Sequence, residues 1–117
     1  MKTHRESHLS AVEAASTFAA LGSEQRLGVL NALVRAGRDG LSIGELGARS
    51  GITGSTLTHH LKILTQAGLV RQLRQGRSII CAAAAHDELQ ALSHYLLSEC
   101  CADAPSGIET RKDRPHV

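Results

Sequence analysis

Apolar residues recur three or four positions apart in five stretches of the chain, and this spacing predicts five amphipathic helices. The stretches cover about residues 8–20, 24–36, 41–50, 54–67 and 86–101. The first carries Leu9, Val12, Ala15, Phe18 and Ala19 on one side, and the last carries Leu89, Leu92, Leu96 and Cys100.

The residues at the ends of these stretches support their limits. Ser23 and Thr53 stand where an N-cap belongs, and Gly37, Gly51 and Gly68 each end a periodic stretch. The turn between the third and fourth helices has three residues and contains a glycine. Two helices joined in this way are typical of a helix-turn-helix.

Residues 69–74 have a different pattern, in which apolar and polar positions alternate, and Gln75-Gly76 then forms a turn before the largely apolar segment 77–82. This pattern predicts a β-hairpin that follows the fourth helix directly. We expect Arg71, Arg74 and Arg77 to lie near its tip, away from the core. The resulting fold class is mainly α with a small β-hairpin (α+β): four helices, two strands and a last helix.

The chain has 117 residues, of which 42% are hydrophobic, so it is long enough for one compact domain and too short for a separate catalytic domain. We expect this domain to cover residues 9–101. Residues 1–8 are expected to be flexible, and the polar segment 102–117 to be a disordered tail. With one Phe, one Tyr and no Trp, the core must consist of aliphatic side chains.

Charge is distributed unevenly along the chain. Residues 46–86 contain five basic residues and no acidic one, although the whole chain has a net charge of only +2. A basic segment in a small domain favours a polyanionic partner, although a solvated face with chance clustering would have the same composition.

The N-terminal residues, the apolar runs and the number of cysteines indicate the cellular compartment. Residues 1–10 are polar and do not resemble a secretory signal, and no apolar run has the roughly 18 residues of a membrane span. The three cysteines are an odd number. We therefore expect a protein of the reducing cytoplasm.

An exposed helix can enter the major groove of DNA while a basic hairpin beside it contacts the backbone. The expected contacts to base edges are short polar residues early in the fourth helix, and the expected phosphate or minor-groove contacts are basic. They are Gly54, Ser55, Thr56, Thr58 and His59 in the first group, and Lys62, Arg71, Arg74 and Arg77 in the second. Ordinary solvent exposure is an equal alternative for Thr56 and Thr58. His60 is expected to pack or to hydrogen-bond the backbone rather than to act as a ligand.

The segment 55–71 (STLTHHLKILTQAGLVR), followed by Arg74-Gln-Gly-Arg77, resembles the ArsR (arsenic-repressor) family of winged helix-turn-helix regulators. The upstream segment 21–27 (LGSEQRL) also matches, and the resemblance covers roughly residues 10–101. It implies a homodimer that pairs through the first and last helices, binds inverted-repeat operator DNA and represses transcription of its own operon. One departure is Cys81, where the second strand of the hairpin often ends in Tyr.

The resemblance leaves the inducer open, because members of this family bind inducers at several places. A Cys-x-Cys motif is absent from residues 42–46, and the acidic and histidine residues of the last helix do not have the spacing of a zinc site. The remaining candidate is the pair Cys100-Cys101, whose Cα atoms, about 3.8 Å apart, are too close for a relaxed disulfide. Two thiols can bind a soft centre such as trivalent arsenic.

Trivalent arsenic takes three ligands, so a two-thiol site favours methylarsenite, whereas arsenite requires a third ligand, for which Cys81 is the one cysteine left. No cofactor is expected to be needed for DNA binding. The alternatives are a structural role for these cysteines, a persulfide or redox sensor that bridges Cys81 and Cys100, a thiol oxidoreductase, and a winged helix that binds protein. A structural role for the cysteines would leave the DNA-binding function unchanged. The absence of a Cys-x-x-Cys motif argues against a thiol oxidoreductase.

Overall fold

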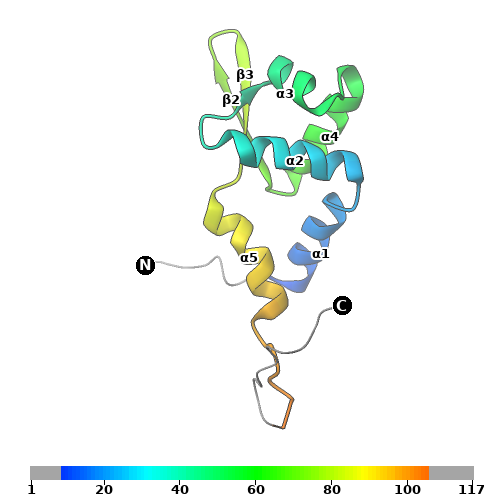
Figure 1. The fold of residues 1–117 in the computed structure, drawn as a ribbon, viewed down its shortest axis with the longest axis vertical. Coiled ribbons are helices and arrows are strands. Elements are labelled where there is room, and N and C mark those ends of the chain that lie inside the picture. The colour runs from blue at the N-terminus through cyan, green and yellow to red at the C-terminus, as the bar shows by residue number, and fades with distance from the viewer. Residues whose placement is uncertain (1–8, 106–117) are drawn as a thin grey trace.

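The computed structural model describes residues 9–105 and contains five helices and three short strands in this part of the chain (Figure 1). In chain order they are α1 (Ala11–Ala20), α2 (Glu24–Ala36), β1 (Leu41–Ser42), α3 (Ile43–Ser50), α4 (Gly54–Gln66), β2 (Val70–Gln75), β3 (Ser78–Ala83) and α5 (His86–Leu97). The expected flexibility of residues 1–8 falls outside the described residues, as does most of the expected tail. Within the described part, no helix is long and apolar enough to cross a membrane.

Side-chain caps set the starts of three helices. The Oγ atoms of Ser10, Ser23 and Ser42 each accept a hydrogen bond from the backbone N–H three residues later. Ser10 and Ser42 also have a glutamate at that third position, and its carboxylate accepts from the N–H of the serine. These reciprocal bonds satisfy donors that a helix leaves free at its N-terminus.

The sheet has one more strand than the sequence predicts. The strand order is β1-β3-β2, with both pairings antiparallel. Leu41 pairs with Cys81 and Ser42 with Ile80, so these residues do not open the third helix as expected. Ser42 has extended backbone as the N-cap of α3 (φ −69°, ψ 164°), and extended backbone is free to pair with a neighbouring strand.

Gly40 allows this close approach of β1 to β3. Its φ of +69° lies in the left-handed region, and a Cβ at this position would collide with the carbonyl oxygen of Cys81. A side chain here would therefore push β1 away from the sheet.

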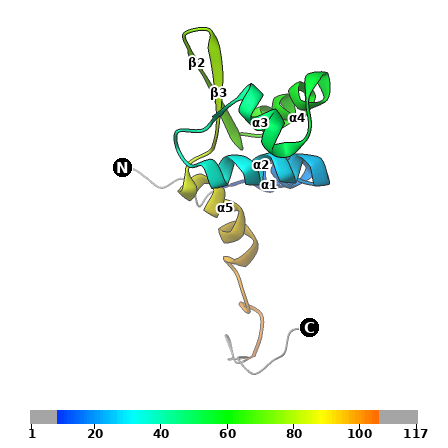
Figure 2. The ribbon, with the colours of Figure 1, turned by 45° about the horizontal axis from the view of Figure 1, so that its top comes forward.

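The core lies where α2, α3 and α4 meet the sheet. Its largest fully buried side chains are aliphatic, together with one cysteine: Val29, Leu33, Leu46, Leu57, Leu64 and Cys81. Helices α1 and α5 lie on the side of α2 that faces away from the hairpin and α3 (Figure 1). Rotation of the view shows the hairpin standing out from the helices, with α5 extending away from them (Figure 2).

The last helix is shorter than the sequence predicts. It ends at Leu97, and the chain continues in turns in which the Cys100 N–H bonds to the Leu97 carbonyl. The prediction extended the helix because Leu96 and Cys100 continue its apolar spacing. Leu96 is 65% exposed, however, so it contributes little packing among the described residues that would hold a further turn in place.

Candidate nucleic-acid interface

Helix α4 has one buried face and one exposed face. Leu57, Leu61 and Leu64 pack into the core, as their spacing predicts. The six residues predicted to contact DNA from this helix are all exposed: Gly54, Ser55, Thr56, Thr58, His59 and Lys62. Thr53 occupies the expected N-cap position but forms no capping hydrogen bond.

His60 lies on the buried face of α4. Its Nε2 is 3.0 Å from Oε1 of Gln25 in α2, and because an amide oxygen accepts, Nε2 carries the hydrogen. The Nδ1 atom is buried without a partner among the described residues. Burial lowers the pKa of His60, and the nearby charge of Arg26 lowers it further. The packing role expected for this histidine is confirmed, with a side-chain partner on α2.

The three arginines of the hairpin do not lie together. Arg77 lies in the turn between the strands and Arg74 pairs with Ile79 near it, so both are close to the tip as expected. The expectation for Arg71 is wrong, since it pairs with Ala82 near the start of β2, at the base of the hairpin. The alternation of a β-strand also places Arg71 on the face opposite that of Gln72.

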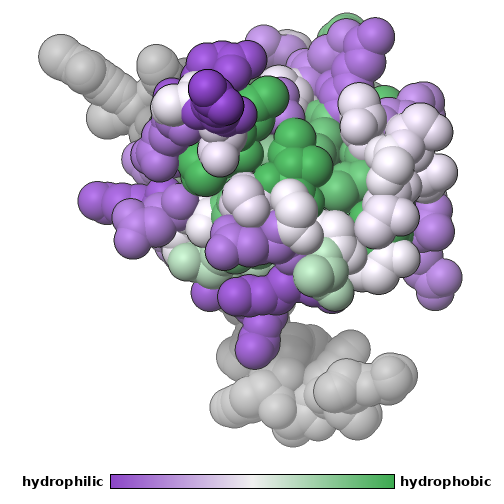
Figure 3. Space-filling model, turned by 90° about the horizontal axis from the view of Figure 1, so that it is seen from above, coloured by the Kyte–Doolittle hydropathy of each residue, from purple (hydrophilic) through white to green (hydrophobic). Residues whose placement is uncertain are grey.

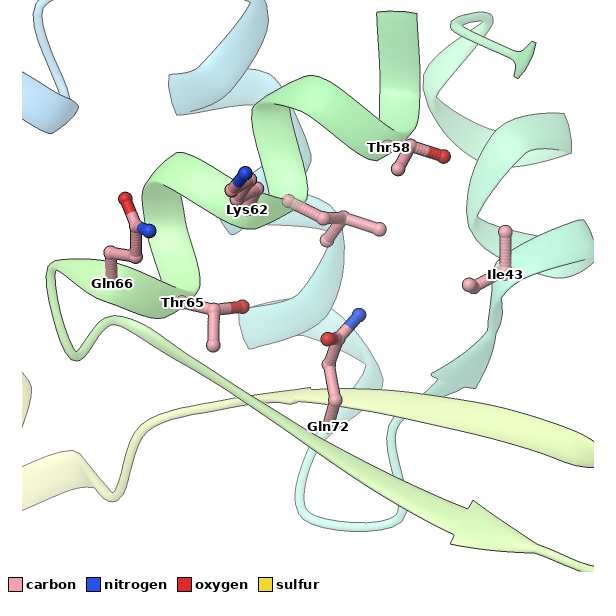
Figure 4. Close-up of a pocket in the computed structure, with 7 residues that line it drawn as sticks. Ile43, Thr58, Lys62, Thr65, Gln66 and Gln72 are labelled. Atoms are coloured by element: carbon pink, nitrogen blue, oxygen red, sulfur yellow. The ribbon is translucent and has the colours of Figure 1, made fainter. Parts of the chain in front are cut away.

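A shallow groove of about 200 Å³ separates α4 from the hairpin and the start of α3. Its walls combine apolar and polar side chains, which are drawn in Figure 4: Ile43, Thr58, Leu61, Lys62, Thr65, Gln66 and Gln72. From above, apolar surface lies in the middle of this side of the molecule and is bordered by hydrophilic and weakly polar residues (Figure 3).

Gln72 is one of the polar residues of this groove that the sequence analysis did not single out, together with Thr65 and Gln66. Its side-chain amide lies 3.7 Å from the sulfur of buried Cys81 and donates to it. The alternation of strand residues predicts on which face of the sheet the Gln72 side chain lies. It does not predict that α4 crosses the same face.

Cys100 and Cys101 bring their sulfurs within 3.5 Å of each other, although they are adjacent in the chain. Both are exposed free thiols, and Cys101 is the one described non-glycine residue with positive φ (63°). A backbone in this region is uncommon for a residue with a Cβ. The hydrogen bond with Cys101 raises the pKa of the Cys100 thiol, so Cys100 is protonated near neutral pH.

Cys81 has very different surroundings. It is fully buried between β1 and β2, and burial raises the pKa of its thiol. Within residues 9–105, no three histidine, cysteine or acidic side chains form a group that could hold a metal ion. The described structure therefore gives the Cys100–Cys101 pair no third protein ligand.

Known proteins are similar to this chain in sequence and in fold. Residues 21–72 match the family model of a helix-turn-helix domain. An uncharacterised HTH-type transcriptional regulator, YceK from Bacillus subtilis, is 36% identical over 64 residues, which are 55% of this chain and 63% of that protein. The match thus spans less than two thirds of the length of YceK.

Two solved structures match over more of their length. An ArsR-like transcriptional regulator from Rhodococcus sp. RHA1 is 33% identical with a TM-score of 0.65, covering 79% of this chain and 82% of the other. The transcriptional repressor BigR from Xylella fastidiosa is 27% identical with a TM-score of 0.60, covering 78% and 89%. With α3 and α4 as the helix-turn-helix and β2–β3 as the wing, the chain belongs to the ArsR family of winged helix-turn-helix transcriptional regulators.

Proposed function

We propose that this protein is a homodimeric repressor that binds inverted-repeat operator DNA through α4 and the wing. The observation that carries this proposal is the exposed polar face of α4 beside a hairpin whose tip carries Arg74 and Arg77. An α-helix fits the major groove, and arginines that flank it bind phosphates or the minor groove. The repressor BigR, which has the same fold, supports the direction of regulation.

Residues 46–86 supply the electrostatic part of binding. They include all of α4 and the wing, and they contain five basic residues without an acidic one. Phosphate contacts of this kind give affinity for any sequence, whereas contacts to base edges give preference for an operator.

Exposed apolar side chains on α1 and α5 support a dimer through these helices. Val12 is 79% exposed, and Leu96 and Leu97 are 65% and 64% exposed. Large apolar side chains that are left exposed favour burial against a partner. A second copy that covers them would place two α4 helices in one particle, as an inverted repeat requires.

Variants of the wing and of α4 test the proposed division of roles. Arg77→Ala is expected to weaken binding to promoter DNA and to random DNA by the same factor, because it removes a phosphate contact. His59→Ala and Ser55→Ala are expected to weaken promoter binding alone. Fluorescence anisotropy with both duplexes measures the two affinities. Equal losses on both duplexes for the α4 variants would contradict the assignment.

We further propose that trivalent arsenic induces release by binding Cys100 and Cys101. For a bond of about 2.3 Å, as in zinc thiolates, sulfurs 3.5 Å apart give an angle of about 100° at the bound atom. This angle is narrower than a tetrahedral one and suits a pyramidal centre. Because residues 9–105 place no third protein ligand beside the pair, methylarsenite, which needs two thiols, fits better than arsenite.

The reaction is a condensation without a change of oxidation state. Two S–H bonds and two As–O bonds of methylarsonous acid break, two As–S bonds form, and two water molecules leave. The raised pKa of Cys100 is compatible with this reaction, because the thiol proton leaves with the arsenic-bound hydroxyl. Binding next to α5 would stabilise a dimer arrangement in which the two α4 helices no longer match half-sites one helical turn apart.

Serine variants test this inducer site. Cys100→Ser and Cys101→Ser are each expected to keep DNA affinity and to lose release by methylarsenite. Cys81→Ala is the matched control and is expected to keep release. The assay is operator anisotropy against arsenite, methylarsenite, antimonite, zinc and persulfide.

Three results would overturn the arsenical site. One is release of DNA by methylarsenite from either serine variant. Another is loss of methylarsenite release in Cys81→Ala. The third is release by persulfide with none by any arsenical, which would favour the sulfur-sensing alternative.

A further inference from the structure

A second cavity, away from α4 and from the two exposed cysteines, lies where the end of α2, the base of the hairpin and the start of α5 meet. It has a volume of about 780 Å³, within the range of about 300–1,000 Å³ that is usual for pockets of small organic ligands. The groove beside α4, with about 200 Å³, falls below this range.

The inner wall of this cavity is apolar. It is formed by Leu33 and Val34 of α2, Ala83 at the end of β3 and Leu89 of α5. Val34 is 49% exposed, so part of this apolar wall faces solvent. An apolar molecule of suitable size would remove this surface from water.

Two arginines from separate parts of the chain line the same cavity. Arg38 comes from the turn after α2, and Arg71 comes from the base of the hairpin. Glu88 is the acidic residue that lines the same cavity, and its carboxylate already accepts a hydrogen bond of 3.2 Å from the Ala85 N–H. Two guanidinium groups against one carboxylate leave a net positive charge at the rim, and guanidinium binds carboxylates well.

We propose that this cavity binds a small organic anion with an apolar body, such as an aromatic carboxylate. The apolar wall takes the body of the ligand, while Arg38 and Arg71 bind its carboxylate. This site is independent of the thiol pair and goes beyond the proposed arsenical response. It also gives Arg71 a role that its place at the base of the hairpin allows.

Binding of 1-naphthoate to the full-length protein tests this proposal. Because the chain has no tryptophan, the fluorescence of the naphthalene ring can be followed without that background. We expect saturable binding of one naphthoate per chain, and binding at least tenfold weaker for the neutral analogue 1-naphthalenemethanol.

Charge-removing variants locate the binding site. Arg38→Gln and Arg71→Gln are each expected to weaken naphthoate binding about tenfold, equivalent to about 1.4 kcal/mol. Arg35→Gln is the matched control, because Arg35 is exposed on the last turn of α2 and does not line the cavity. It should change the affinity by less than twofold. All three residues are exposed, so the variants are expected to fold, which circular dichroism verifies.

Several results would overturn the proposal. They are absence of saturable naphthoate binding, equal affinity for the neutral analogue, and an equal loss in Arg35→Gln. Release of operator DNA by methylarsenite is measured separately, so failure of this site leaves the proposed function standing.

Discussion

His60 shows how one buried side chain links the DNA-binding helix to the rest of the domain. It joins α4 to Gln25 of α2, and burial favours its neutral form by lowering its pKa below the ordinary value of about 6.5. As pH falls below about 6.5, the unfolded chain takes up a proton at this position that the folded chain still excludes. Stability from this group is therefore complete above about pH 6.5 and is lost as the pH falls towards the folded-state pKa.

We predict that His60→Gln reduces the loss of stability between pH 7.5 and pH 5.5. The effect of one group is at most about 1.4 kcal/mol per pH unit. Urea unfolding at the two pH values measures it. If His60→Gln and wild type lose the same stability, His60 is not the group responsible.

At the level of residues, sequence reasoning located the exposed face of α4 well, because helical periodicity assigns a side to each position. It placed Arg71 wrongly, because it grouped the three arginines at the tip, whereas Arg71 pairs with Ala82, four positions along β2 from the Gln75–Ser78 pair beside the turn. Sequence reasoning also could not predict the close approach of the Cys100 and Cys101 sulfurs, because this approach depends on the left-handed backbone of Cys101.

At the level of elements, the long periodic helices were predictable and the short or terminal elements were not. The two-residue strand β1 has no periodicity of its own and exists because Gly40 lets it approach β3. The end of α5 was overestimated because apolar spacing continues past the point where packing stops. Val12 of α1 and Leu96 of α5 stand on the predicted apolar faces of their helices and are exposed in the single chain.

This exposure leads to a prediction about α5. Leu96→Asp is expected to shift the protein from dimer to monomer, because it places a charge in the proposed interface. Leu73→Asp is the control, since Leu73 is 52% exposed but lies on the wing. Sedimentation velocity measures both variants. A dimeric Leu96→Asp, or a monomeric wild type at micromolar concentration, would contradict pairing through α5.

At the level of the whole molecule, the two ends of the domain have different surfaces. The hairpin, α3 and α4 form the end that carries the basic residues of segment 46–86, whereas α1 and α5 carry exposed aliphatic side chains (Figure 1). This division suits a dimer that pairs at one end and holds DNA at the other. The net charges in the sequence already suggested this division: the 41 residues of segment 46–86 carry a net charge of +5, and the rest of the chain carries −3.

The salt dependence of binding to DNA from the protein's own promoter region tests this account most directly. A dimer that uses Lys62, Arg74 and Arg77 from each chain makes about six phosphate contacts, so the affinity should fall about a thousandfold between 50 and 200 mM salt. Promoter DNA should remain preferred over random DNA throughout. An affinity that hardly changes with salt, or equal affinity for both DNAs, would contradict the assignment of α4 and the wing as a DNA-binding surface.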